Sequence, residues 1–189
     1  MSEFIRQYFL HTGVGWAVAG AMFAVMLGCV GSARGIRIAS AQAAGVLSEK
    51  PELFGKLLIL MALPGTQGFY AFICAIFIAL RTGLLAHKLT VAPVVGLSLF
   101  FVGFCMGVVE WRSAIYQGET SAAAINLTGK RPEEGGRAIL LPAMVETYAV
   151  VALLAAILLI LWITGVETSS VPAWAAGQVE ATVPANVVP

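Results

Sequence analysis

The segment from Met61 to Tyr70 reads MALPGTQGFY and lies inside a run of apolar residues long enough to cross a membrane. It places a proline, a threonine, a glutamine and a tyrosine where hydrocarbon would surround the chain. Amide and hydroxyl groups find no water there, so each needs a protein partner or an ion, or it costs free energy. The polar centre of this segment therefore predicts a binding site within a membrane-spanning helix.

The whole chain has the composition of an integral membrane protein. Of its 189 residues, 59% are hydrophobic and 11% are charged, and the mean hydropathy is +0.90. Soluble domains do not reach such values, and a net charge of +1 gives no indication of nucleic-acid binding. Four apolar segments, 13–30, 57–80, 91–109 and 138–163, approach the roughly 20 residues that a spanning helix needs. The sequence predicts an all-α membrane protein with four transmembrane helices.

Basic residues predict the orientation in the membrane. They gather in two of the three connections, at Arg34, Arg37, Lys50, Lys56, Arg112, Lys130, Arg131 and Arg137. The central connection contains only Arg81 and Lys88. Because basic loops remain in the cytoplasm, we expect the loops between helices 1 and 2 and between helices 3 and 4 to be cytoplasmic, and both termini to be extracytoplasmic.

The sequence also contains an internal repeat. KPELFGK (50–56) returns as RPEEGGR (131–137), and each is followed by an apolar segment with a proline and a polar centre. In this alignment Gln67 corresponds to Glu146, and VGSAR (30–34) matches VVEWR (108–112), which pairs Ser32 with Glu110. Two fused helical hairpins are the economical interpretation. We expect the first at 1–84, the second at 85–165, and an irregular extracytoplasmic tail at 166–189.

Small residues recur at helical spacing in the first apolar segment, and more sparsely in the third. They are Gly13, Ala17, Ala21, Ala24, Gly28, Ser32 and Gly35, and Gly96, Gly103 and Gly107. Such faces let membrane helices approach closely. Packing inside a single four-helix bundle would explain them. The alternative is that the first and third helices line the inner wall of an oligomeric ring, with the second and fourth outside.

The polar centre of the second segment presents oxygen atoms on one helical face. That face carries residues related as i, i+3, i+4 and i+7, namely Leu63, Thr66, Gln67 and Tyr70. Pro64 cannot donate a backbone hydrogen bond, so nearby carbonyl groups can face a ligand. A carbonyl, a hydroxyl and an amide oxygen suit a hard cation.

The negative partner must come from Glu110 or Glu146, which lie at a depth similar to that of Gln67. An intramembrane carboxylate is by default an ion or proton site. Glu146 could instead be protonated and held by interhelical hydrogen bonds, and Glu110 could be an interfacial residue paired with Arg112. The two carboxylates could also serve as the acid and base of an intramembrane enzyme, or the chain could be a structural or channel-forming proteolipid.

The motifs LPGTQGFYAF (63–72), AMVETYA (143–149) and GSARG (31–35), with the KPE and RPE loops, resemble the membrane rotor-ring proteolipid of bacterial V-type ATPases, the K or c subunit. The resemblance covers nearly all of the chain except the tail. It implies a homo-oligomeric ring in a bacterial plasma membrane, turning against a stator subunit that offers an arginine and bound to a central-stalk subunit on the cytoplasmic side. It implies no catalysis and no cofactor in this chain, only transported sodium ions or protons.

The sodium-carrying members of that family imply a set of ligands. In this sequence the matching positions are Leu63 through its carbonyl, Thr66, Gln67 and Glu146, with Tyr70 closing the site through a hydrogen bond to the glutamate. A glutamine on the third helix completes the family's site, and our alignment puts Glu110 at that position. We therefore expect Glu110 to be a fifth ligand, protonated when sodium is bound. We also expect sodium as the ion, because a proton does not need the additional oxygens.

Overall fold

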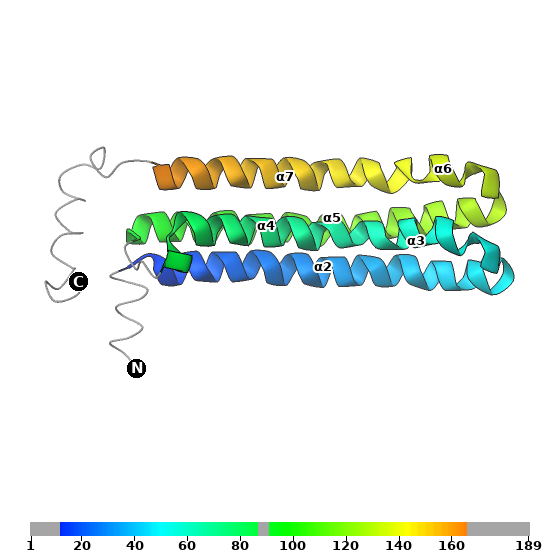
Figure 1. Ribbon diagram of the computed structural model, residues 1–189, viewed down its shortest axis with the longest axis horizontal. Helices are drawn as coiled ribbons and strands as arrows, with labels where there is room; N and C mark the ends of the chain where they lie inside the picture. Colours follow the sequence, from blue (N-terminus) through cyan, green and yellow to red (C-terminus); the bar gives the residue numbers. More distant parts are fainter. Residues whose placement is uncertain (1–11, 87–90, 166–189) are drawn as a thin grey trace, which may run out of the picture.

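The structure is a computed structural model that describes residues 12–86 and 91–165. Long helices lie side by side in one elongated bundle (Figure 1). The first and last described helices begin and end at the same end of the bundle, and two tight turns lie at the opposite end. The tail expected at 166–189 and Lys88 of the central connection lie outside the described residues.

The described residues form four rods, each a straight helical segment that runs the length of the bundle. Two are single helices, α2 (Val14–Glu49) and α5 (Pro93–Lys130). The rod after α2 comprises η2 (Pro51–Leu53), α3 (Phe54–Ala62), η3 (Leu63–Gly65) and α4 (Thr66–Arg81), with η4 (Leu84–Ala86) beyond it. The rod after α5 comprises η5 (Pro132–Glu134), α6 (Gly135–Ala138) and α7 (Leu140–Gly165). All four rods are long and apolar enough to cross a membrane, which confirms the predicted all-α fold with four transmembrane helices.

The boundaries of α2 and α5 correct the sequence-based expectation. The segments expected as cytoplasmic loops are mostly helix, because α2 continues to Glu49 and α5 to Lys130. Basic residues mark the end of an apolar segment but do not break a helix, and neither stretch contains a proline before Pro51 and Pro132. The 38 residues of α5 span about 57 Å at about 1.5 Å per residue, far more than the roughly 30 Å hydrocarbon core.

The two turns have the same geometry, which supports the repeat. Lys50 has φ −134° and ψ 69°, and Arg131 has φ −134° and ψ 83°. In each turn the backbone N–H of that basic residue donates to a carbonyl four residues earlier, at 2.9 Å and 2.8 Å, and a proline follows. The turns therefore relate the hairpins by an offset of 81 residues, from Lys50 to Arg131.

This offset corrects the expected alignment of the long helices. Both run without interruption back from their turns, so residues at equal distances from the turns correspond. Ser32 then corresponds to Ser113, and Glu110 corresponds to Cys29. The pairing of Ser32 with Glu110 was wrong by three residues, almost one helical turn, because the motif match rested on a few similar letters.

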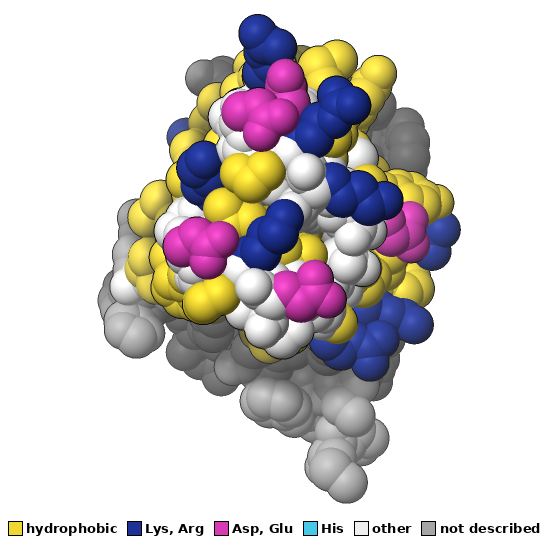
Figure 2. All heavy atoms as spheres, turned by 90° about the vertical axis from the view of Figure 1, so that its right-hand side faces the viewer, with side chains coloured by type: hydrophobic (Ala, Val, Ile, Leu, Met, Phe, Trp, Pro, Cys, Tyr) yellow, Lys and Arg dark blue, Asp and Glu magenta, His cyan; other side chains and the backbone are white. Residues whose placement is uncertain are grey.

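The turn end of the bundle carries mixed charge (Figure 2). Basic and acidic side chains are intermixed on that face. Two lysines form hydrogen bonds between the hairpins there. Lys50 Nζ donates to the carbonyl of Gly129 at 2.6 Å, and Lys56 Nζ donates to the carbonyl of Pro132 at 2.9 Å. The lysines of the first turn thus satisfy carbonyls beside the second turn.

Glycines bring α2 and α5 into backbone contact. A Cβ added to Gly20 would lie 2.6 Å from Phe100 Cα, and one added to Gly31 would lie 2.5 Å from Trp111 Cα. On the α5 side, a Cβ on Gly107 would lie 2.8 Å from the carbonyl oxygen of Phe23. The small-residue faces therefore pack these two helices against each other within one chain, while α4 packs on α2 and α7 packs on α5.

Two apolar clusters fill the bundle on either side of a polar layer. The cluster nearer the chain ends includes Ala17, Ala24, Cys74, Ile78, Leu99, Met106, Leu153, Ala156 and Ile160. The cluster nearer the turns includes Ala39, Ala43, Leu53, Leu57, Leu60, Ala124, Ile125 and Ala138. Between them the buried polar residues are Ser32, Gln67, Glu110, Ser113 and Gln117. The polar layer is where the candidate site lies.

Candidate functional site

A local break in the second rod exposes the first group of site atoms. The helix tightens into η3 at Leu63–Gly65, where Pro64 has no N–H to donate. The Leu63 carbonyl accepts a hydrogen bond from Thr66 Oγ1 at 3.0 Å, and that hydroxyl lies 3.4 Å from Gln67 Oε1. The predicted carbonyl, hydroxyl and amide oxygens are therefore clustered on one side of the rod.

Glu146 lies on α7 and is in contact with two other helices. Tyr70 Oη donates to Glu146 Oε1 at 2.6 Å, and Gln117 Nε2 lies 3.4 Å from Glu146 Oε2. Both contacts cross from a different helix, α4 and α5 respectively. A tyrosine hydroxyl that donates to one oxygen and an amide that donates to the other suit a carboxylate. The expected contact between Tyr70 and Glu146 is thus present.

Gln117 connects the two hairpins at this level. Its side chain is fully buried, with 0% exposure. Its Oε1 accepts a hydrogen bond from Gln67 Nε2 at 2.5 Å, and its Nε2 donates to the Pro142 carbonyl at 3.1 Å. The sequence analysis did not predict a role for Gln117, because the third apolar segment ends at residue 109. The helix α5 continues beyond it to Lys130. The available signal was a glutamine seven residues beyond Glu110, on the same helical face.

The position expected for Glu110 is corrected by this geometry. The third-helix glutamine is present as Gln117, and Glu110 lies about 10 Å farther along α5 toward the chain ends. Among the described residues neither oxygen of Glu110 has a hydrogen-bond partner. The alternative pairing with Arg112 is not observed either, because the Arg112 guanidinium donates to Tyr116 Oη at 2.6 Å and lies over its ring. Of the six predicted site residues, Glu110 alone is outside the hydrogen-bond network of the described part of the chain.

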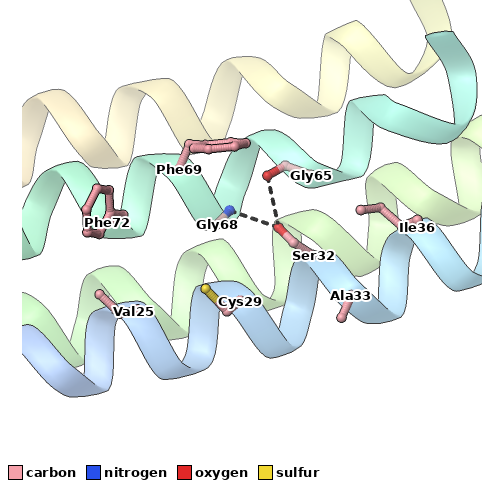
Figure 3. A pocket seen from close by; sticks show the side chains of 9 residues that line it. All are labelled: Val25, Cys29, Ser32, Ala33, Ile36, Gly65, Gly68, Phe69 and Phe72. Carbon is pink, nitrogen blue, oxygen red and sulfur yellow. Dashed lines mark hydrogen bonds between the residues drawn. The ribbon is translucent and has the colours of Figure 1, made fainter.

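A separate apolar groove runs between α2 and α4 (Figure 3). It has a volume of about 420 Å³ and is lined by Val25, Cys29, Ser32, Ala33, Ile36, Gly65, Gly68, Phe69 and Phe72. Ser32 Oγ accepts the Gly68 N–H at 2.8 Å and lies 3.4 Å from the Gly65 carbonyl. The polar groups of Ser32, Gly65 and Gly68 in the groove are therefore paired within the chain, and the other side chains that line it are mostly apolar.

The fold and the site together define a class of protein. It is a membrane protein of two similar helical hairpins, in which one carboxylate is held at mid-bundle by a tyrosine hydroxyl and a glutamine amide from two other helices. The family model for the C subunit of ATP synthase matches the chain twice, at residues 19–78 and 100–159. The matches are related by the same offset of 81 residues as the turns. The chain belongs to this family of ATP synthase C subunits.

Curated relatives agree with this assignment. The chain is 35% identical over 149 residues to the V-type sodium ATPase subunit K of Enterococcus hirae, covering 79% of this chain and 92% of that protein. It is 36% identical over 153 residues to the A-type ATP synthase subunit K of Methanocaldococcus jannaschii, covering 79% of this chain and 65% of that one. The resemblance to V-type proteolipids is confirmed, and with it the interpretation as a non-catalytic, multi-pass membrane subunit of an ion-translocating ATPase.

Proposed function

We propose that this chain is the ion-carrying ring subunit of a rotary V-type ATPase and that Glu146 binds the transported ion. The observation that carries the proposal is the Glu146 carboxylate, which accepts a hydrogen bond from Tyr70 and is adjacent to Gln117, the residue that also bonds Gln67. A carboxylate at this depth is costly while charged. An ion that neutralises it allows the site to pass through lipid.

We propose sodium as that ion, with the proton as the alternative. The ligands are the Leu63 carbonyl and the side chains of Thr66, Gln67 and Glu146. Gln117 orients Gln67 through their 2.5 Å hydrogen bond and lies within reach of Glu146. Hard cations prefer such an all-oxygen set, and the relative from Enterococcus hirae is named a sodium ATPase subunit. Tyr70 closes the site by holding Glu146 Oε1.

The assembly that we propose is a closed ring of identical chains, supported by unequal exposure of equivalent residues. On α5 the side chains of Ala114 and Gln117 are fully buried, at 0% exposure. At the equivalent positions of α2, Ala33 is exposed and Ile36 is 37% exposed, and both line the apolar groove. The helix α4 covers the α5 face within the chain, so by the internal repeat α7 of a second copy covers the α2 face. A head-to-tail contact of this kind generates a ring when its rotation closes, and we propose that it closes here.

In the proposed mechanism no covalent bond changes in this chain. An ion enters from the stator and neutralises the Glu146 carboxylate, while Tyr70 keeps its hydrogen bond to Oε1 and so closes the loaded site. After rotation the ion leaves beside the stator's arginine, which the family resemblance implies. We place the ring in a bacterial plasma membrane with both termini outside, and the central stalk on the charged turn end. Within each chain, residues 1–84 and 85–165 form the two repeated units.

The ion is tested by labelling Glu146 with a hydrophobic carbodiimide, which attacks a protonated carboxyl group. Purified rings are labelled across pH with sodium, with potassium and with neither. We expect millimolar sodium to slow labelling at Glu146 and potassium to leave it unchanged. Labelling that sodium does not slow at any pH would assign the ring to protons, with Gln67 and Tyr70 holding a protonated Glu146. Absence of any labelling at Glu146 would contradict the ion-carrying role itself.

A further inference from the structure

Glu110 is a buried acid that the proposed site does not use. Its side chain has 0% exposure. A Cβ placed on Gly28 of α2 would lie 3.7 Å from the Cβ of Glu110. Within the described residues both of its carboxylate oxygens lack a hydrogen-bond partner. A charged carboxylate without donors or a cation is strongly disfavoured in such a place. The neutral acid is the form that these surroundings accommodate.

The groups that face Glu110 provide no positive charge. The titratable side chains that interact with it electrostatically are Tyr70 and Cys74 of α4 and Glu146 of α7, and α2 presents Gly28. On α5 itself, Arg112 is exposed and directs its guanidinium to Tyr116. If Glu110 were ionised as well as Glu146, no cationic side chain among the described residues would compensate the second negative charge.

Glu110 is also enclosed along the axis of the bundle. Toward the chain ends, the apolar cluster that contains Met106 and Cys74 follows it. Toward the turns, Gln67 bridges to Gln117 and lies 3.5 Å from Ser113 Oγ, which separates Glu110 from the outer part of the polar layer. Nothing in this arrangement of described residues gives Glu110 a direct path to water.

We propose that Glu110 is a second proton-binding site, one per chain, that keeps its proton while the ion at Glu146 exchanges. The inference rests on the proposed function, because it assumes that Glu146 is the exchanging site. With Glu110 neutral, the two carboxyl groups together carry one negative charge, so a single cation neutralises the membrane interior of the chain. With Glu110 ionised, a second cation would be required before the site could face lipid.

The test is infrared spectroscopy of purified intact rings at neutral pH with saturating sodium. A protonated carboxylic acid has a carbonyl stretch that a carboxylate lacks. We expect this band in the unmodified protein, its loss in Glu110→Gln, and its retention in Glu119→Gln, a control at an exposed glutamate of the same helix. We also expect sodium to protect Glu146 from carbodiimide equally well in Glu110→Gln, because an amide then replaces a neutral acid of the same shape.

Two outcomes would overturn the proposal: absence of the acid band from the unmodified ring, or loss of sodium protection in Glu110→Gln, which would make Glu110 a charged ligand. Should Glu110→Gln not assemble, Glu110→Cys introduces the residue found at the equivalent position of α2, and the same loss of the band is expected. Failure of the sodium proposal is distinguishable, since a proton-carrying ring gives an additional acid band that Glu146→Gln removes.

Discussion

Gln117 Oε1 lies 2.5 Å from Gln67 Nε2, so an amide of the second hairpin is bonded to an amide of the first in the middle of the bundle. The same Gln117 side chain reaches the Pro142 carbonyl and the carboxylate of Glu146. The proposed ion site is therefore built between hairpins and not within one of them. Its geometry depends on how the two halves of the chain pack.

Gln117→Leu should weaken both ion binding and folding. The substitution keeps a buried side chain of similar size but removes the hydrogen bonds to Gln67 Nε2 and to the Pro142 carbonyl, at about 0.5–1.5 kcal/mol for each bond. We expect the sodium concentration for half-protection of Glu146 to rise at least about tenfold, and the melting temperature to fall. Gln42→Leu is the control, because Gln42 bonds Asn126 at 2.7 Å near the exposed turn end. Equal effects of the two variants would contradict the role of Gln117.

Tyr70→Phe should loosen the closure of the site without disturbing assembly. It removes the 2.6 Å hydrogen bond to Glu146, and a bond to a charged group contributes about 1.5–3 kcal/mol. We expect faster release of bound sodium and an apparent affinity reduced by about tenfold or more, measured by filtration of radioactive sodium.

The matched control for that experiment is Tyr148→Phe. Tyr148 is two residues after Glu146 on the same helix, and its side chain is 75% exposed. It should bind and release sodium as the unmodified ring does. Unchanged release from Tyr70→Phe would mean that the tyrosine hydroxyl does not hold the ion in place.

Gly20→Ala should destabilise the chain, whereas Gly45→Ala should not. Both glycines lie inside α2, so each substitution gains about 1 kcal/mol of helix propensity. A Cβ at Gly20 would lie 2.6 Å from Phe100 Cα, while one at Gly45 meets nothing within 4 Å. We expect a lower thermal midpoint for the first variant and an equal or higher one for the second. Similar midpoints would indicate that α2 and α5 are not in backbone contact.

Ala33→Trp should prevent ring assembly while leaving the folded chain intact. Ala33 is exposed and lines the groove between α2 and α4, where the proposed second copy packs. Native mass spectrometry should detect isolated chains for this variant and rings for Ala41→Trp, a control at an exposed position of α2 outside the groove. Rings from Ala33→Trp would show that the groove faces lipid.

Much of the fold could be predicted from local sequence. Apolar length predicted the number of spanning helices, and the KPE and RPE motifs predicted that the chain is an internal repeat. The ends of α2 and α5 could not be predicted from hydropathy, which reports on lipid contact. These helices continue past the hydrocarbon because nothing in their sequences breaks them.

The site was predictable where one helix supplies it and less so where helices meet. Leu63, Thr66 and Gln67 share one rod, so helical spacing alone brings them together. The third-helix residue depended on the relative axial positions of α4 and α5, which glycine contacts and turn geometry set. A shift of seven residues on α5 exchanges Glu110 for Gln117, and local sequence does not resolve that choice.

The unequal faces of the two hairpins determine how many ions the proposed ring carries in each revolution. The α2 groove has Cys29 and Ile36 where α5 has Glu110 and Gln117. In the alignment of the two polar motifs, Gln67 stands where the second hairpin has Glu146. In the proposed ring, each chain of four helices therefore delivers one ion per revolution, half the number that a carboxylate on every hairpin would deliver. Fewer ions then share the work of each ATP. Because moving one charge across 100 mV requires about 2.3 kcal/mol, such a ring can drive each ion against a steeper electrochemical gradient.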